Sequence, residues 1–499
     1  MSPRTSQMNA EKKPRAFIAA GSTWAQRVGE FLLLAVLLIV SGSTAAQDAE
    51  RPKESKAAPK SGSKQTAVVK RQVVNADETK AVTTAVTKSN QALAEEMAEL
   101  RARIDALTQK LAQQEKKSAE KNTAAGWRDK RPFIRSDDGN RQLEFIGYGQ
   151  ADFRAYQRGR VPVNSFVMRR ARLGIRGKIY QHYEFNMVGD FADTESALLR
   201  NLYVNIDYLT GLQFRFGQFK EPFSQEELHS SSHLDFVERS MVNNLAPGRS
   251  PGAQIWGELF GEAVLYQLGA FNGKGVLAAN TSNTPEVIAR LRFSPWANTK
   301  QAFLQGLSFG GAYADGRTKN EKSLKARTES RSITFFSAVP VNGDFKRANA
   351  ELTYVHGPFA YRTEYVKTRQ HREGLGPNGS DLSEIVAKGY MAQMTYLLTG
   401  EDKPEEGAII PRRGFLNAGG EKSGAGAWEI KLRYSSLRVN DGALNPCAEV
   451  YTTGFNWYLS SYVKYVVDVN LERFSNPVFS PRADKKNFVT YLARVQFLL

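Results

Sequence analysis

Basic side chains recur at alternate positions in parts of this 499-residue chain. In residues 166–178 one parity carries four basic residues: Arg170, Arg172, Arg176 and Lys178. The opposite parity is apolar: Val167, Ala171, Leu173 and Ile175. Polar faces elsewhere carry further basic residues: Arg215, Arg290, Arg292, Arg362, Lys431, Arg433, Lys464 and Arg494. A row of guanidinium and ammonium groups would attract oxyanions and replace their hydration in steps. We therefore predict that these residues line an anion pathway.

An alternative interpretation gives the same residues a structural role. A wet lumen tolerates any polar side chain, and a basic residue on one strand can pair with a carboxylate on its neighbour. The candidate carboxylates are Glu184, Asp190, Asp207, Glu364 and Glu429. For the whole set of basic residues, a bias toward anions is the better interpretation.

Residue patterns that would indicate catalysis are sparse. His229 and His233 have the spacing of metal ligands on a helix, but the glutamate of a zinc protease motif is missing, and a loop fits better. Gly147-Tyr148-Gly149 lacks the third glycine of a dinucleotide motif, which favours close strand packing. The single cysteine, Cys447, excludes an intramolecular disulfide. We expect no enzymatic activity, no metal and no cofactor.

Strands must position the basic residues, because apolar and polar residues alternate in segments of about ten residues beyond residue 131. About sixteen segments are centred near residues 149, 172, 186, 203, 216, 255, 267, 290, 308, 351, 363, 393, 431, 454, 467 and 493. An even count places both ends of a barrel on the periplasmic side. Long external loops are expected at 221–251, 315–346 and 369–387, and residues 400–424 form a long periplasmic exception.

Soluble all-β folds also alternate, so a sandwich or propeller is the competing fold. The segments are long for soluble strands, and aromatic residues near segment ends, such as Tyr451, Phe455 and Trp457, are typical of interfacial girdles. We predict a transmembrane antiparallel β-barrel of about 16 strands over residues 132–499.

The N-terminal region reads as an export signal. A basic stretch precedes ten apolar residues, 31–40, and small residues follow up to Ala46. A buried core helix is the alternative. Ten residues are too few to span a bilayer as a helix, and a mean hydropathy of -0.44 argues against a helical membrane protein. We interpret residues 1–46 as a signal peptide.

Two further segments precede the barrel. Residues 47–88 contain few large apolar side chains and are predicted to be a flexible linker. Apolar residues then recur at spacings of three and four, at Leu93, Met97, Leu100, Ile104, Leu107 and Leu111. This spacing is typical of a coiled coil, which we place at residues 89–120; a lone amphipathic helix packed on another element is the alternative.

The formal net charge of +17 fits a nucleic-acid binder, a membrane-surface binder or a protein that handles anions. Export removes most of the case for nucleic acid. The charge therefore agrees with the predicted anion pathway.

Four motifs in order resemble the phosphate-selective porin O and P family: residues 166–177 (FVMRRARLGIRG), 215–227 (RFGQFKEPFSQEE), 427–435 (AWEIKLRYS) and 454–458 (GFNWY). The similarity runs from about residue 140 to 499. It implies a sixteen-stranded trimer in the outer membrane, with a long third loop, here 221–251, folded into each pore. It also implies an arginine ladder and a lysine cluster that guide phosphate.

Together these observations predict a Gram-negative outer-membrane porin for passive, anion-selective diffusion of phosphate or related oxyanions. Its expected partners are small anions, outer-membrane lipid and two further copies of the chain. The alternative is a structural anchor or adhesin whose barrel tethers a periplasmic coiled coil.

Overall fold

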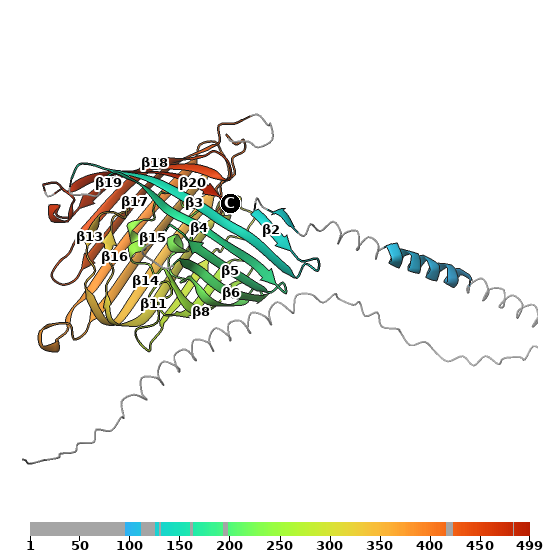
Figure 1. The fold of residues 1–499 in the computed structure, drawn as a ribbon, viewed down its shortest axis with the longest axis horizontal. Coiled ribbons are helices and arrows are strands. Elements are labelled where there is room, and N and C mark those ends of the chain that lie inside the picture. Colours follow the sequence, from blue (N-terminus) through green and yellow to red (C-terminus); the bar gives the residue numbers. More distant parts are fainter. Residues whose placement is uncertain are drawn as a thin grey trace, which may run out of the picture. The chain divides into compact units, whose positions relative to one another are not determined.

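A computed structural model describes residues 95–110, 125–128, 131–159, 163–192, 198–415, 423–482 and 484–499 (Figure 1). The predicted signal peptide and linker lie outside these residues. Residues 95–110 form a helix on which Met97, Leu100, Ile104 and Leu107 are each 50–59% exposed. Of the predicted coiled coil at residues 89–120, the structure describes only this helix. The pairing of the helix with helices of other copies stays a prediction.

Sixteen antiparallel strands form a closed barrel (Figure 1). The first eight are β3 (Arg141–Tyr156), β4 (Ser165–Ile179), β5 (Tyr183–Asp190), β6 (Leu199–Leu209), β7 (Leu212–Lys220), β8 (Arg249–Leu259), β9 (Val264–Phe271) and β10 (Glu286–Phe293). The others are β11 (Leu307–Lys322), β14 (Pro340–His356), β15 (Phe359–Arg372), β16 (Leu382–Leu397), β17 (Ala427–Asn440), β18 (Cys447–Tyr458), β19 (Val463–Phe474) and β20 (Asn487–Leu498). Pairing of β20 with β3 closes the barrel, with Arg494 opposite Asp152. The predicted strand count is confirmed.

The barrel wall is uneven in height. Strands β5 to β10 have 8–11 residues, whereas the other strands have 12–17. Two predicted loops are shorter than expected, because β11 extends to Lys322 and β15 extends to Arg372. The prediction was wrong there because alternation continues past the ends of the segments that were counted.

Alternation decides which side chains face inward. On β17, Lys431 and Arg433 are 2% and 4% exposed, whereas Ile430 and Leu432 are 49% and 51% exposed. A globular protein would show the reverse, because its apolar side chains leave water. The barrel therefore carries its apolar surface outside, where lipid would cover it.

A hairpin precedes the barrel. Strand β1 (Ala125–Arg128) pairs with β2 (Arg131–Arg135), and β2 pairs with the first residues of β3, as in Phe133 opposite Glu144. The hairpin and the C-terminus lie at the same end of the barrel (Figure 1). We call this the turn end, and the opposite end the loop end.

Two loops from the loop end fold into the lumen. Loop L3 (residues 221–248) joins β7 to β8 and contains the helices α3 (Gln225–Leu228) and η1 (Met241–Asn244). Loop L5 (residues 323–339) joins β11 to β14 and contains β12 (Ala326–Arg327) and β13 (Thr334–Phe336).

Apolar residues anchor L3 and L5. Met241 and Val242 of L3 share a buried cluster with Phe335 of L5 and with two wall residues, Ile385 and Phe474. Burying such side chains contributes roughly 1.5–3 kcal/mol each. L3 and L5 are therefore packed elements of the fold.

The remaining short helices are α4 (Ala302–Gln305), η2 (Pro377–Gly379) and η3 (Pro477–Phe479), in connections between strands. Within the described part of the chain, helices with both the length and the apolar character to cross a bilayer are absent.

Candidate functional site

Loop L3 begins with a helix that points its N-terminus at the wall. Ser224 caps α3 by accepting a hydrogen bond from the backbone N–H of Glu227. The backbone N–H groups of Gln225 and Glu226 donate to the carboxylates of Glu351 and Glu364, at 3.1 and 3.2 Å. Free N–H groups at a helix N-terminus favour anionic acceptors. Wall carboxylates thus hold the first turn of L3.

Two cations hold the other end of α3. Lys220 donates to the carbonyls of Glu227, Leu228 and His229 at 2.5–3.0 Å, and Arg239 donates to the carbonyls of Glu226, Glu227 and His229 at 2.8–3.1 Å. Free carbonyls at a helix C-terminus favour cations. Both ends of α3 are therefore held by groups of the matching charge.

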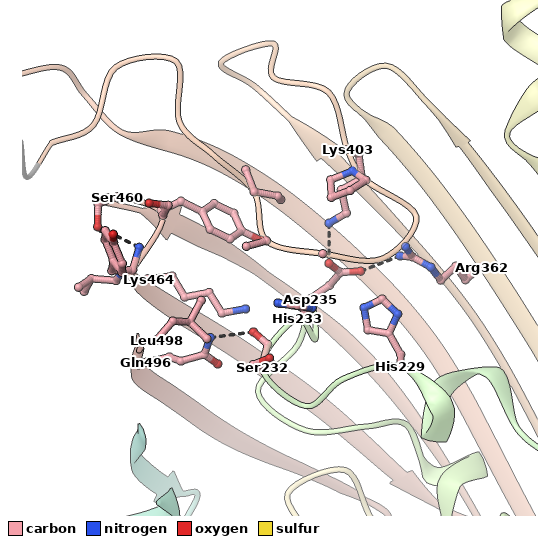
Figure 2. Close-up of a pocket in the computed structure, with 18 residues that line it drawn as sticks. His229, Ser232, His233, Asp235, Arg362, Lys403, Ser460, Lys464, Gln496 and Leu498 are labelled. Carbon is pink, nitrogen blue, oxygen red and sulfur yellow. Dashed lines mark hydrogen bonds and ion pairs between the residues drawn. The ribbon is translucent and has the colours of Figure 1, made fainter. Parts of the chain in front are cut away.

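Asp235, in the middle of L3, accepts hydrogen bonds from four side chains, and Figure 2 shows Arg362 and Lys403 beside its carboxylate. Its carboxylate lies 2.9 Å from Arg362 and 2.5 Å from Nζ of Lys403. Its backbone carbonyl accepts from Lys431 at 2.8 Å and from Asn456 at 2.9 Å. Burial alone would raise the pKa of Asp235, but Lys403 and Arg362 hold that pKa well below its usual range.

Lys403 comes from the long connection at the turn end, segment 398–426, which is described except for residues 416–422. Lys403 also pairs with the buried Glu429 of the wall. Glu405 of the same segment pairs with Arg292 at 2.9 Å, and its carbonyl accepts from Arg362 at 3.0 Å. The connection that broke the expected loop pattern therefore enters the barrel and meets L3.

Four arginines surround Glu238, three residues after Asp235 in L3. The carboxylate lies 2.7 Å from Arg154 and 2.5 Å from Arg169, with Arg170 at 3.8 Å and Arg494 at 3.7 Å. Burial alone would raise the pKa of Glu238, but these arginines hold it well below its usual range.

Arg169 reaches Glu238 because of a β-bulge. Opposite β3, Gln150 pairs with Arg170 but Ala151 pairs with Met168, so Arg169 is an extra residue in β4. A bulge shifts the parity of the residues beyond it. The prediction that Val167 shares a face with Ala171, Leu173 and Ile175 was therefore wrong: Val167 lines an internal cavity.

The basic residues predicted from parity fall into two groups. Seven of them are at most 7% exposed. One of these, Arg170, also lines a cavity beside Glu238. The other six are held in contacts with the loops or the wall: Arg290, Arg362, Lys431, Arg433, Lys464 and Arg494. Arg290 pairs with Glu351, Arg433 with Glu329, Lys431 with Asp468 and Arg494 with Asp152. Lys464 donates to the carbonyl of Leu234 at 2.9 Å. Five of these six residues contact L3 or L5 directly, and Arg290 contacts Glu351, which accepts a hydrogen bond from the first turn of α3.

The second group faces open space. A cavity of about 750 Å³ at the turn end is lined by five basic residues: Arg131, Arg172, Arg176, Lys220 and Arg249. Glu406 is the one acidic side chain among the residues lining it. Asp190 and Glu144 pair with Arg172 and Arg176 at 2.8 Å, so these carboxylates offset part of the charge.

Two further cavities also contain basic residues. Arg215 and Arg292 line one of about 320 Å³ together with Glu258, Glu405 and Glu406, and the Arg215 guanidinium lies 5.1 Å from the Trp256 ring centre. A third, of about 480 Å³, is lined by Arg169, Arg170, Arg239, Arg327 and Arg331 around Glu238. Lys178 instead pairs with Glu184 and Asp207 at 2.8 and 2.9 Å, which is the cross-strand pairing of the alternative interpretation.

Parity did not predict several of the basic residues that line the cavities: Arg131, Lys220, Arg239, Arg249, Arg327 and Arg331. They lie in loops, in the hairpin or at strand ends, where alternation carries no information. One signal was available, because residues 221–238 contain five acidic residues: Glu221, Glu226, Glu227, Asp235 and Glu238. An acidic loop beside a basic wall predicts docking through ion pairs.

His229 and His233 lie on L3 with ring centres 6.5 Å apart (Figure 2). Burial, with a contribution from Arg362, lowers the pKa of His229 to about 3; burial and Lys464 lower that of His233 to about 4. Among the described residues, no group of three His, Cys, Asp or Glu side chains could hold a metal ion.

Comparison with known proteins decides the family. A profile of the phosphate-selective porin O and P family matches residues 142–497. The chain belongs to this family. Porin O of Pseudomonas aeruginosa is 23% identical over 337 residues, which cover 59% of this chain and 74% of that protein. The chain is therefore a porin of the outer membrane.

Solved structures of outer-membrane proteins match most of this chain at low sequence identity. OmpT of Vibrio cholerae matches with a TM-score of 0.47 at 10% identity, over 74% of this chain and 100% of that one. The outer membrane channel DcaP of Acinetobacter baumannii matches with a TM-score of 0.47 at 12% identity, over 73% of this chain and 99% of that one.

Proposed function

We propose that this porin conducts anions selectively, with phosphate or related oxyanions as its substrates, and works as a trimer. The observation that carries the proposal is the cavity of about 750 Å³ at the turn end, which five basic side chains and one acidic side chain line. A cleft of one charge sign with low-dielectric walls concentrates ions of the opposite sign.

The basic cavities lie on either side of L3. From the loop end, an anion first meets the arginines around Glu238, and from the turn end it meets Arg172, Arg176 and Arg249. Guanidinium groups suit oxyanions because their fixed donors match pairs of oxygen atoms. Several sites in series permit fast transport, provided that none of them binds the anion too tightly for release.

The anion pathway in this proposal includes only some of the basic residues that parity predicts. It keeps Arg170, Arg172, Arg176, Arg215 and Arg292, which line cavities, and adds the loop and hairpin residues beside them. Five of the buried residues act on anions only indirectly, by holding the loops or the wall: Arg290, Arg362, Lys431, Arg433 and Lys464. Arg494 also lies 3.7 Å from Glu238, beside the loop-end arginines.

The trimer rests on the resemblance to the family and on the helix at residues 95–110. Its apolar stripe of Met97, Leu100, Ile104 and Leu107 is half-exposed or more. A stripe with spacings of three and four residues suits the seam of a coiled coil between copies of the chain. We place this coiled coil in the periplasm, where it would reinforce the trimer.

The zero-current potential of the purified protein in a planar bilayer tests the proposal. Under a potassium chloride gradient we expect the sign of an anion-selective channel, and we expect added phosphate to block the chloride current. Anion selectivity without phosphate block would leave a general anion porin. A cation-selective potential would contradict the proposal.

A second candidate is a structural anchor whose barrel tethers the coiled coil. It is favoured by the depth to which L3, L5 and segment 398–426 fill the lumen, since Arg362 and Lys464 line a space of only about 20 Å³. An anchor would form no channels in the same bilayer, so one experiment separates the candidates.

A further inference from the structure

Glu238 lines the cavity of about 480 Å³, which we call the loop-end cavity. Its carboxylate occupies the position that a bound oxyanion would take there. One carboxylate oxygen accepts from Arg154 at 2.7 Å and from Arg169 at 2.5 Å, and the other accepts from Arg169 at 3.2 Å. Arg170 and Arg494 complete the ring at 3.8 and 3.7 Å. The carboxylate thus meets the paired, charge-assisted donors that guanidinium groups offer to phosphate.

The cavity around Glu238 holds more positive charge than this carboxylate neutralises. Five arginines line its space of about 480 Å³, and Glu238 is the one acidic residue among its lining residues. Arg327 and Arg331 come from L5, and no carboxylate of the described residues lies within 4 Å of either guanidinium. Nε of Arg170 is buried without a hydrogen-bond partner. Donors for a second anion are therefore present.

A dissolved oxyanion that enters this cavity meets donors already engaged by Glu238. A group tethered next to its partners competes at an effective concentration in the millimolar range or above. The free anion must displace the carboxylate or share its arginines, and either requirement lowers its affinity. Weak binding is what a conducting site needs, because an anion held too tightly would not leave.

We infer that Glu238 is a tethered competitor for substrate anions, which keeps the arginine cluster at the loop end from trapping phosphate. This inference rests on the proposed function. It names the residue that sets the affinity for phosphate in the loop-end cavity. Glu238 belongs to L3, whereas Arg154, Arg169, Arg170 and Arg494 belong to the wall strands β3, β4 and β20.

A merely structural role makes a different prediction. If Glu238 only fastens L3 to the wall, its loss should weaken the fold and leave the phosphate affinity of folded channels unchanged. A tethered competitor instead predicts that folded channels without the carboxylate bind phosphate more tightly. The two roles therefore separate in a phosphate titration.

The test compares Glu238→Gln with Glu329→Gln in planar bilayers. Glu329 is a matched control: it is a buried loop carboxylate, it pairs with Arg433 of the wall, and it does not line the loop-end cavity. Both substitutions remove one negative charge from the lumen. For Glu238→Gln we expect the phosphate concentration that halves the chloride current to fall by about tenfold, whereas Glu329→Gln should change it by less than about twofold.

The outcomes separate the inference from the proposed function. A cation-selective wild type overturns both. An anion-selective wild type with no shift in Glu238→Gln, or with equal shifts in both variants, overturns the inference alone. If Glu238→Gln yields no channels, Glu238→Asp keeps the charge and draws the carboxylate back by one methylene; a smaller shift in the same direction supports the inference, and an unchanged block overturns it.

Discussion

The carboxylate of Asp235 lies 2.9 Å from Nη1 of Arg362, although the two residues are 127 positions apart. Asp235 belongs to L3, and Arg362 belongs to β15 of the wall. Arg362 was predicted to face the anion pathway, but it is instead paired with an acidic residue of the loop that narrows the lumen. This pair explains why a basic wall alone does not define the pathway.

The first prediction concerns this pair. Replacing Asp235 with asparagine removes the charge shared by Arg362 and Lys403, both of which are buried. An uncompensated buried charge costs about 3–5 kcal/mol. We expect the free energy of unfolding to fall by that order, as measured by urea unfolding of the reconstituted protein.

Glu405→Gln is the control for Asp235→Asn. Glu405 pairs with Arg292 in the same network, but its side chain is 39% exposed. Its loss should cost less than about 1 kcal/mol, because water screens the pair. Equal losses in the two variants would show that Asp235 is not a main anchor of L3.

The second prediction concerns pH. The folded loop keeps His229 and His233 neutral, because burial lowers their pKa values to about 3 and about 4 from the ordinary 6.5. Between these values the unfolded chain binds protons that the folded chain does not, so the free energy of unfolding falls as the pH drops. Above pH 6.5 the histidines should add no pH dependence.

Urea unfolding at several pH values tests this window. Replacing both loop histidines with glutamine should flatten the slope between about pH 6.5 and 4. His371→Gln is the control, since His371 is 46% exposed near the loop end and should leave the slope unchanged. A slope that survives the double substitution would assign it to other groups.

The third prediction concerns selectivity. The double substitution Arg172→Gln, Arg176→Gln removes two positive charges from the turn-end cavity. Because such a cavity raises local anion concentration by about tenfold or more, the ratio of anion to cation permeability should fall severalfold. The zero-current potential measures this ratio directly.

Arg317→Gln is the matching control for selectivity. Arg317 is exposed at the loop end and pairs with Asp344 and Glu373, both at 2.6 Å. It does not line the turn-end cavity, and its loss should leave the potential unchanged. If both sets of variants shift the potential equally, net charge rather than the cavity sets selectivity.

The fourth prediction concerns the N-terminal helix. Replacing Leu100 and Ile104 with aspartate places charges in the apolar stripe, where a coiled coil would bury them. The trimer should dissociate at a lower temperature, as seen on gels and by light scattering. Single-channel conductance should stay the same. An unchanged trimer would favour the lone helix.

The sequence alone determined the barrel and the direction of most side chains. A strand has a period of two, so the alternation that places Lys431 inward also places Ile430 and Leu432 outward. Sixteen such segments require closure, because an open edge would leave backbone groups unpaired in lipid. The alternation of apolar and polar residues within each strand was therefore enough to predict the fold class.

Only the tertiary structure decided which basic residues meet water. Arg362, Lys431 and Arg433 satisfy the parity rule as well as Arg172 does, yet L3 and L5 cover them. The bulge at Arg169 and the contact of Glu238 with Arg494 depend on strand register and loop docking. These join residues far apart in the chain, and a periodicity that describes one strand at a time holds no information about them.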